Sequence, residues 1–303
     1  MNSSASLSTD GTSMAFDSAL KPVAKAILPR TAVKHLRRII HKVWPPPFDN
    51  TYPWLNYTFS ELLKDERCEP KPMYAWGVIQ GAALAKVLGL PRISVIEFGV
   101  AGGQGLLALE AIAELAERKT NIGIDVFGFD SGIGLPKPED FRDQPNLYFQ
   151  GQFRMDRARL ESKLRRAKLC LGPVKETIPL LIAGNLAPVA FVSFDLDLYS
   201  STRDALILFK SNYAHLLPRV VSYFDDIFGY TFNDHCGERA AIAEFNSSSS
   251  ARKICPIYGL RYLIPRFARD DGWPDGMYFA HFFEHPFYST QDSLSNLATQ
   301  CQR

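Results

Sequence analysis

The sequence predicts an α/β fold in which a mostly parallel sheet carries helices on both faces. The first observation is alternation: from about residue 74 onward, short apolar runs of strand length alternate with segments of helical composition. The second is composition, because 46% hydrophobic, 12% aromatic and 22% charged residues are typical of a globular protein and exclude a wholly disordered chain or a fibre. The third is length, since 303 residues suffice for one enlarged α/β domain with extensions.

The elements are predicted in chain order from these runs. Helices are expected over Tyr74–Leu88, Leu106–Arg118, Arg157–Lys168 and Thr202–Leu217. Apolar runs between them predict parallel strands at Ile93–Phe98, Ile124–Phe129, Leu169–Leu171, Val189–Phe194 and Val220–Phe224. A loop rich in Gly, Pro and Asp then joins two further predicted strands, Gly259–Ile264 and Met277–Phe283, so the domain is expected to finish in a hairpin.

The ends of the chain differ from this region. We expect a disordered polar tail over 1–20, a basic helical extension over 21–72, the α/β domain over 73–288 and a polar tail over 289–303. Within the extension, Lys21–Trp44 holds seven basic residues and no acid, and its apolar residues recur at helical spacing. Such a stripe packs on the main domain or on a second copy of the chain, or lies on an anionic membrane surface, and both interpretations stay open.

Composition also excludes several classes of protein. No apolar run approaches the length that a membrane-spanning helix needs, and residues 1–20 lack the apolar core of a secretory signal. Residues 1–50 balance at +4 and the rest of the chain at −2, so no nucleic-acid partner is expected. The five cysteines are scattered, without a C-x-x-C pair, which favours reduced thiols and a cytoplasmic location.

A glycine-rich segment, Glu97-Phe-Gly99-Val-Ala-Gly102-Gly103-Gln-Gly105, runs from the first predicted strand directly into a helix. Glycines at this point let the backbone approach a ligand at the carboxyl edge of the sheet. The spacing differs from the dinucleotide fingerprint, and Glu97 favours a cationic ligand over a pyrophosphate. The alternative is a tight turn that binds nothing.

Asp130 ends the second predicted strand and opens the segment Asp130-Ser131-Gly-Ile-Gly134-Leu-Pro136. A carboxylate about 25 positions beyond a glycine-rich turn commonly accepts hydrogen bonds from a ribose diol. The alternative is that Asp130 caps a turn.

Four further carboxylates come after two apolar strands: Asp195 and Asp197 after one, Asp225 and Asp226 after the other. Because consecutive strands of such a sheet are commonly neighbours, the four are expected to converge, and a divalent cation such as Mg²⁺ would relieve their repulsion. The alternative is that they cap helices and turns. His235 lies shortly after the Asp pair and is a candidate general base if its loop folds inward.

With these motifs placed, the stretch from about Met73 to Phe283 resembles the class I S-adenosylmethionine-dependent methyltransferases, and within them the macrocin (TylF-type) O-methyltransferases. The matching motifs are the glycine-rich segment, the Asp130–Pro136 segment, Asp195-Leu-Asp197-Leu-Tyr199-Ser-Ser201-Thr202, the Asp225-Asp226 pair and the Gly237–Phe245 helix. Three positions depart from the family pattern, namely Gly105, Gly132 and Leu196.

The resemblance implies a Rossmann-like sheet of seven strands with the last one antiparallel. It implies S-adenosylmethionine (AdoMet) at the glycine-rich turn, with Glu97, Gly99, Gly102, Gly103, Asp130 and Ser131 as cofactor-binding residues. It implies a divalent metal on Asp195, Asp225 and Asp226, and Asp197 as the base that deprotonates a hydroxyl.

The expected function is therefore O-methylation of a small hydroxylated, sugar-like or glycosylated molecule, assisted by a divalent metal. One rival is a metal-independent methyltransferase whose Asp residues only cap and orient. Another is a catalytically silent Rossmann-like binding module that is tethered through its basic N-terminal arm. A nicotinamide enzyme is disfavoured by the glycine spacing.

Overall fold

The structure, a computed structural model, describes residues 53–68, 70–228, 233–269 and 272–289. The predicted tail 1–20, the basic segment Lys21–Trp44 and residues 290–303 lie outside this part of the chain. The predictions of membrane contact and of pairing with a second copy, which rest on that segment, therefore stay predictions.

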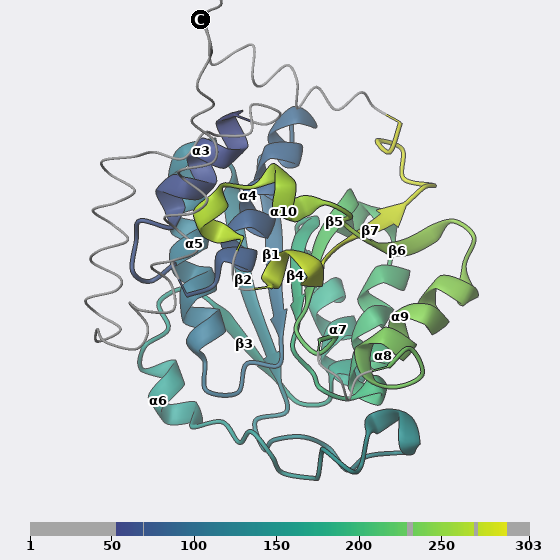
Figure 1. The fold of residues 1–303 in the computed structure, drawn as a ribbon. Coiled ribbons are helices and arrows are strands. Elements are labelled where there is room, and N and C mark those ends of the chain that lie inside the picture. The colour runs from purple at the N-terminus through teal and green to yellow at the C-terminus, as the bar shows by residue number, and fades with distance from the viewer. Residues whose placement is uncertain (1–52, 69, 229–232, 270–271, 290–303) are drawn as a thin grey trace, which may run out of the picture. The chain divides into compact units, whose positions relative to one another are not determined.

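Seven strands form one sheet in the order β3-β2-β1-β4-β5-β7-β6 (Figure 1). They are β1 (Arg92–Phe98), β2 (Gly123–Asp130), β3 (Lys168–Leu171), β4 (Val189–Phe194), β5 (Leu216–Phe224), β6 (Arg252–Pro256) and β7 (Met277–Phe282). Strands β1 to β5 pair in parallel, whereas β7 runs antiparallel to both β5 and β6. The predicted fold class is confirmed: a mostly parallel, seven-stranded Rossmann-like sheet with an antiparallel last strand.

The longer helices cover the two faces of this sheet in two groups (Figure 1). The first group packs around α4 and consists of α3 (Pro53–Leu62), α4 (Pro72–Val87) and α5 (Gln104–Thr120). The second packs around α8 and consists of α7 (Val174–Ala183), α8 (Tyr199–Ala205) and α9 (Gly237–Ser248). Short helices α6 (Arg157–Glu161) and α10 (Leu260–Leu263) lie in connections. Among the described helices, none has the length and apolarity that crossing a membrane requires.

The core places a rigid layer directly beneath the carboxyl ends of the central strands. Every residue of β4 is buried, as are six of the seven residues of β1. The ring of Phe194 stacks on those of Phe98 and Phe224, with centroids 5.4 and 4.6 Å apart. These aromatic pairs link β1, β4 and β5 at the last residue of each strand, one position before the chain enters the loops that form the site.

Three predicted elements are wrong in extent or type. The predicted helix Thr202–Leu217 ends as α8 at Ala205 and continues only as 3₁₀ turns, because Leu216 and Leu217 are buried in β5. The predicted helix Arg157–Lys168 ends at Glu161, since the backbone N–H groups of residues 165–167 donate to the buried Glu110 carboxylate instead.

The third error concerns the hairpin. Residues 260–263 of the predicted strand Gly259–Ile264 form the short helix α10, and the strand beside β7 is β6 (Arg252–Pro256). The Asn246 side chain holds β6 from α9, because its amide donates to the carbonyl of Ile254 and accepts from the N–H of Ile254. Helix α7 was not predicted, because Pro179 inside it is a residue that normally interrupts a helix.

Candidate active site

A cavity of about 660 Å³ opens at the carboxyl ends of β1, β2 and β4. Its walls come from the turn after β1 (Gly99–Gly105), from the loop after β2, from the start of α7, and from the β4–α8 turn. Strand β1 has β2 on one side and β4 on the other, so the cavity lies where the strand order reverses. Open α/β sheets bind their ligands at such a point.

Glycine in the turn after β1 brings two walls of the cavity together. Gly99 has a left-handed φ of 84°, and a Cβ built on it would lie 1.7 Å from the carbonyl oxygen of Asp195. Only glycine therefore allows the β1 turn to touch the β4 turn. Gly103, the N-cap of α5, has a φ of 80°. A Cβ at Gly102 would meet no atom within 4 Å, so the space beside Gly102 is open.

Glu97 is buried with one carboxylate oxygen hydrogen-bonded and the other unpaired. The Tyr74 hydroxyl donates to Oε1 of Glu97 at 2.7 Å and accepts from the Ser193 hydroxyl at 2.9 Å. Oε2 is buried and has no hydrogen-bond partner, although Glu97 lines the cavity. Burial raises the pKa of Glu97 to about 8. A donor or a cation inside the cavity would satisfy this oxygen.

Gly105, which departs from the family pattern, is explained by the same carboxylate. A Cβ at Gly105 would lie 1.8 Å from Oε1 of Glu97. The inward position of Glu97 thus excludes the small hydroxyl side chain that the pattern has at this position.

Asp130 joins the turns after β1 and β2. Its Oδ2 accepts from the N–H groups of Val100 and Ala101 at 3.0 and 2.9 Å, and its Oδ1 accepts from Gly132 N at 2.7 Å. The capping interpretation is therefore confirmed. A carboxylate accepts about four hydrogen bonds, so a further hydroxyl can still bind on the cavity side, as the ribose interpretation requires. Ser131 closes the next turn, since its hydroxyl donates to the carbonyl of Gly134 at 2.7 Å.

The acidic cluster predicted at the ends of β4 and β5 is assembled. Asp195, Asp225 and Asp226 each place a carboxylate oxygen within 4.8 Å of the other two. Burial, with the nearby charge of Asp225, raises the pKa of Asp195 to about 7, and burial raises the pKa of Asp226 as well. Partly buried carboxylate oxygens at this spacing fit a hard divalent cation, whose charge would relieve the repulsion. The residues present therefore fit the expected metal.

Asp197 lies beside this cluster in a strained backbone conformation. Its φ is 59°, and its backbone N–H donates to Oδ2 of Asp226 at 2.8 Å. Burial raises the pKa of its side chain to about 6, toward the range of a general base at neutral pH. Leu198 occupies the N-cap of α8, so neither Asp195 nor Asp197 caps that helix.

Four groups around these acids were not identified from the sequence. Burial and the nearby charges of Asp226 and Asp197 raise the pKa of Tyr148, and the Tyr223 hydroxyl donates to Oδ1 of Asp225 at 2.8 Å. Glu238 is fully buried, and its Oε2 accepts from Asp226 N at 3.0 Å. Tyr74 is the fourth, through its bond to Glu97. No local pattern marks any of them, because the position of each depends on the packing of separate elements.

His235 is not brought to the cavity. Its side chain is exposed, its backbone N–H donates to Oδ1 of Asn233, and it is absent from the cavity wall. Lys175 and Glu176, by contrast, line the cavity from the start of α7.

No protein-family profile and no curated protein matches the chain. Solved structures do match at low similarity. The calicheamicin methyltransferase CalS11 is 20% identical, with 72% of this chain and 92% of that chain covered and a TM-score of 0.47. The O-methyltransferase NovP is 17% identical, with 68% and 80% covered and a TM-score of 0.45. The O-methyltransferase TomG from Streptomyces achromogenes is 14% identical, with 80% and 94% covered and a TM-score of 0.39. At these scores the likeness carries no functional conclusion, and the function has to come from the chemistry of the site.

Proposed function

We propose that the protein is an AdoMet-dependent O-methyltransferase that acts, with the help of a divalent metal, on a small hydroxylated, sugar-like or glycosylated molecule. One observation carries the proposal. A single cavity is lined both by a glycine-rich turn with the buried, half-unpaired Glu97 and by Asp195 and Asp197, and Asp195 also belongs to the cluster of partly buried carboxylates.

The cofactor fits the turn side of the cavity in charge and in shape. Oε2 of Glu97 would accept a hydrogen bond from the α-amino group of AdoMet, and the Asp130 carboxylate would accept one from a ribose hydroxyl. The open space beside Gly102 lets the ligand approach the backbone. When bound, AdoMet supplies an electrophilic methyl group.

The end of the cavity that Asp195 and Asp197 line would hold the acceptor, and a carboxylate there would take the proton of its hydroxyl. Asp195, Asp225 and Asp226 would bind a divalent cation, which neutralises their charge and lowers the pKa of a neighbouring acceptor hydroxyl. Asp197 would remove the hydroxyl proton, since its raised pKa of about 6 suits a base near neutral pH. The protein then acts chiefly by positioning, because a hydroxyl oxygen must lie in line with the methyl group.

The part of the cavity wall that would contact the acceptor carries polar side chains. Ser201 and Asp204 of α8 and Glu139 of the loop after β2 line this part of the cavity, together with Lys137. Hydroxyl and carboxylate groups suit a neutral polyol, which both donates and accepts hydrogen bonds. This supports the sugar-like acceptor.

The first test is calorimetric titration of the purified chain with S-adenosylhomocysteine, first with Mg²⁺ and then with EDTA. Micromolar binding under both conditions would support the cofactor site and leave the metal to the acceptor step. A panel of hydroxylated acceptors is then assayed with AdoMet, with and without Mg²⁺. Activity that EDTA abolishes and Mg²⁺ restores excludes the metal-independent rival.

The silent binding module remains the alternative to exclude. It predicts no S-adenosylhomocysteine binding, little effect of Asp197→Asn, and loss of a partner when residues 1–50 are deleted. Absence of binding under both titration conditions would overturn the methyltransferase proposal.

A further inference from the structure

One tyrosine of α4 contacts side chains of both β1 and β4. Glu97 of β1 and Ser193 of β4 are partners in the parallel register, so their side chains lie on the same face of the sheet. Helix α4 packs on that face, and Tyr74 in its first turn bonds both of them. Tyr74 is fully buried, so the hydroxyl at the end of its side chain is enclosed by protein.

The Tyr74 hydroxyl gives its proton to Glu97. The Ser193 hydroxyl donates to the Tyr74 hydroxyl at 2.9 Å, which leaves the single proton of Tyr74 for Oε1 of Glu97 at 2.7 Å. Burial raises the pKa of Tyr74, so the phenol keeps this proton. Among the hydrogen bonds of the described residues, this is the one that reaches the Glu97 carboxyl. Tyr74 therefore decides which oxygen of Glu97 is engaged.

The surroundings of this pair restrict both side chains. The Tyr74 ring packs on the rings of Phe191 and Tyr223, with centroids 5.5 and 6.4 Å apart. At the start of α5, a Cβ built on Gly105 would lie 1.8 Å from Oε1 of Glu97 and 3.1 Å from the Tyr74 hydroxyl oxygen. Only a residue without a side chain at this position leaves room for the bond. A closely packed ring holds its hydroxyl in one place, so the direction of the carboxyl is fixed.

The bond leaves Oε2 of Glu97 as a buried acceptor without a partner. Glu97 is 2% exposed, yet it lines the cavity beside the glycine-rich turn. A buried acceptor that lacks a partner is costly, so a ligand that donates to Oε2 gains binding energy. Burial raises the pKa of Glu97 to about 8, and the bond from Tyr74 opposes that rise, which favours the ionised form that an ammonium group binds.

We propose that Tyr74 is a positioning residue for the cofactor, because its hydroxyl holds the Glu97 carboxyl with Oε2 presented to the α-amino group of AdoMet. The inference rests on the proposed function, in which Glu97 accepts that amino group. Without the hydroxyl, the carboxyl would be free to turn, and ordering it again on binding would lower the affinity for the ligand.

The first experiment compares affinities for S-adenosylhomocysteine by calorimetry, in EDTA, so that no metal enters the measurement. Tyr74→Phe keeps the ring and removes the hydroxyl, and it should weaken binding about tenfold. Tyr288→Phe is the matched control, because it removes a tyrosine hydroxyl that is hydrogen-bonded to His281 at 2.9 Å and does not line the cavity. Unchanged affinity in Tyr74→Phe, or an equal fall in the control, would overturn the proposal.

The second experiment tests whether Tyr74 acts through Glu97, by a double-mutant cycle on the same affinity. In Glu97→Gln, the Tyr74 hydroxyl donates to the amide oxygen, which turns the amide nitrogen, a donor, toward the ligand. Tyr74→Phe should therefore weaken binding by less than about twofold in this background. A merely structural role for Tyr74 would give the same fold-loss in both backgrounds and would overturn the proposal.

Gly105→Ala reaches the same bond without changing Tyr74, so it decides the question even if Tyr74→Phe does not fold. Its Cβ would meet the end of a side chain, Oε1 of Glu97, so the carboxyl should shift while the helix stays in place. Affinity for S-adenosylhomocysteine should fall about tenfold, and much less in the Tyr74→Phe background, where the bond is already lost. Unchanged affinity in Gly105→Ala would overturn the proposal, and so would the same loss in both backgrounds.

Kinetics and binding together separate the two proposals. With an acceptor of the panel that turns over, Tyr74→Phe should raise the KM for AdoMet about tenfold and leave kcat at saturating AdoMet unchanged. A fall in kcat with an unchanged KM would overturn the positioning role. Failure of the proposed function would appear as no S-adenosylhomocysteine binding by the unsubstituted chain, which overturns both proposals. Failure of this inference alone would leave that binding intact, with Tyr74→Phe equal to the unsubstituted chain.

Discussion

The two sides of the cavity are built by different means. The glycine side, which comprises Glu97, Gly99–Gly105, Asp130 and Ser131, is shaped mainly by backbone that leaves β1 and β2 directly. The acid side comprises Asp195 and Asp197, which line the cavity, and Asp225, Asp226 and Glu238 beside them. Its carboxylates repel one another, and the Tyr223 hydroxyl donates to one of them, Asp225, at 2.8 Å.

This difference predicts how each side of the cavity responds to substitution. Substitution of Gly99 on the glycine side should damage the fold for steric reasons, because its contact with the backbone of Asp195 cannot adjust. Substitutions on the acid side should alter charge and ligand affinity, while the sheet beneath them stays intact. Four predictions test this contrast, from the largest expected effect to the smallest.

Gly99→Ala should have the largest effect on stability. The new Cβ would meet the Asp195 carbonyl oxygen at 1.7 Å, so the β1 and β4 turns must separate, at a cost of about 4 kcal/mol or more in the free energy of unfolding. Gly89→Ala is the matched control, because Gly89 also has a positive φ but no atom lies within 4 Å of its Cβ position. That variant should lose only about 1–2 kcal/mol. Equal losses in urea unfolding would show that backbone strain, and not the close contact, decides.

Asp225→Asn should weaken Mg²⁺ binding by about 10- to 100-fold, measured by calorimetry. The amide oxygen can still accept from Tyr223, so the fold should persist. In EDTA the variant should be at least as stable as the parent, because one of the repelling charges is gone. Glu97→Gln, on the glycine side, should leave Mg²⁺ affinity unchanged. A fall in Mg²⁺ affinity in both variants would contradict the division into two sides.

Glu97→Gln should change how stability depends on pH. The pKa of Glu97 is about 8 in the folded chain against an ordinary value of 4.5, so the folded state holds a proton that the unfolded state has lost. This carboxyl therefore destabilises the cofactor-free protein increasingly as pH rises from 4.5 to 8. The unfolding free energy of the variant minus that of the parent should increase by more than about 1 kcal/mol between about pH 5 and about pH 8. Urea unfolding at the two pH values measures the gain, and the exposed Glu161→Gln should show none.

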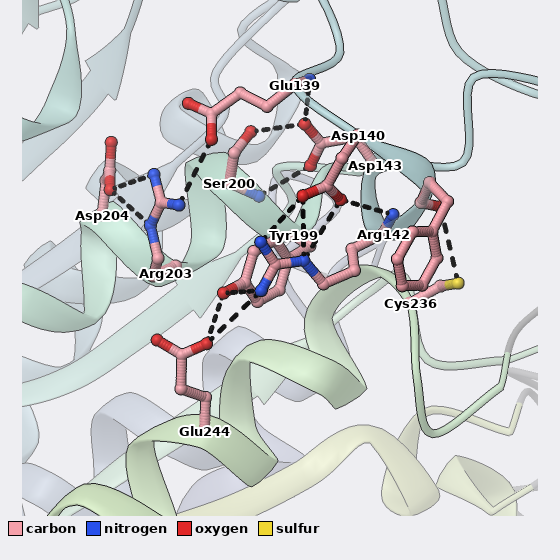
Figure 2. Close-up of polar contacts among 11 residues, drawn as sticks. Glu139, Asp140, Arg142, Asp143, Tyr199, Ser200, Arg203, Asp204, Cys236 and Glu244 are labelled. Atoms are coloured by element: carbon pink, nitrogen blue, oxygen red, sulfur yellow. Dashed lines mark hydrogen bonds and ion pairs between the residues drawn. The ribbon is translucent and has the colours of Figure 1, made fainter.

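The loop between β2 and β3 contacts α8 through the buried Asp143 and through the more exposed Arg142 (Figure 2). Asp143→Ala should therefore lower the free energy of unfolding more than Arg142→Ala does. Loss of the Asp143 carboxylate leaves the buried N–H of Ser200 unpaired, which costs about 2 kcal/mol in unfolding free energy. Arg142 is partly exposed in its ion pair with Asp140, so its loss should cost less than about 1 kcal/mol. Equal losses of unfolding free energy would mean that the Arg142 contacts hold the loop as firmly as the buried Asp143 does.

Local patterns succeeded where one element carries its own signal. The strands β1, β2 and β4 were predicted within about two residues of their bounds, because fully buried parallel strands are continuous apolar runs. The convergence of Asp195, Asp225 and Asp226 was also predicted, since neighbouring parallel strands end at one edge of the sheet. The predicted helix Thr202–Leu217 was wrong, because burial of Leu216 and Leu217 in β5 outweighed helical propensity.

The sequence by itself determined the α/β class, the glycine-rich turn and the positions of the acids, because these depend on periodicity and on the residue types at the end of each strand. Only the tertiary structure decided which groups hold those acids. Tyr223, which bonds Asp225, lies two residues before it on β5, and Glu238 lies on a helix that a loop separates from Asp226. Gly105 is explained only by the inward turn of Glu97. A contact between side chains distant in sequence leaves no local pattern, and packing alone determines which hydroxyl reaches which carboxylate.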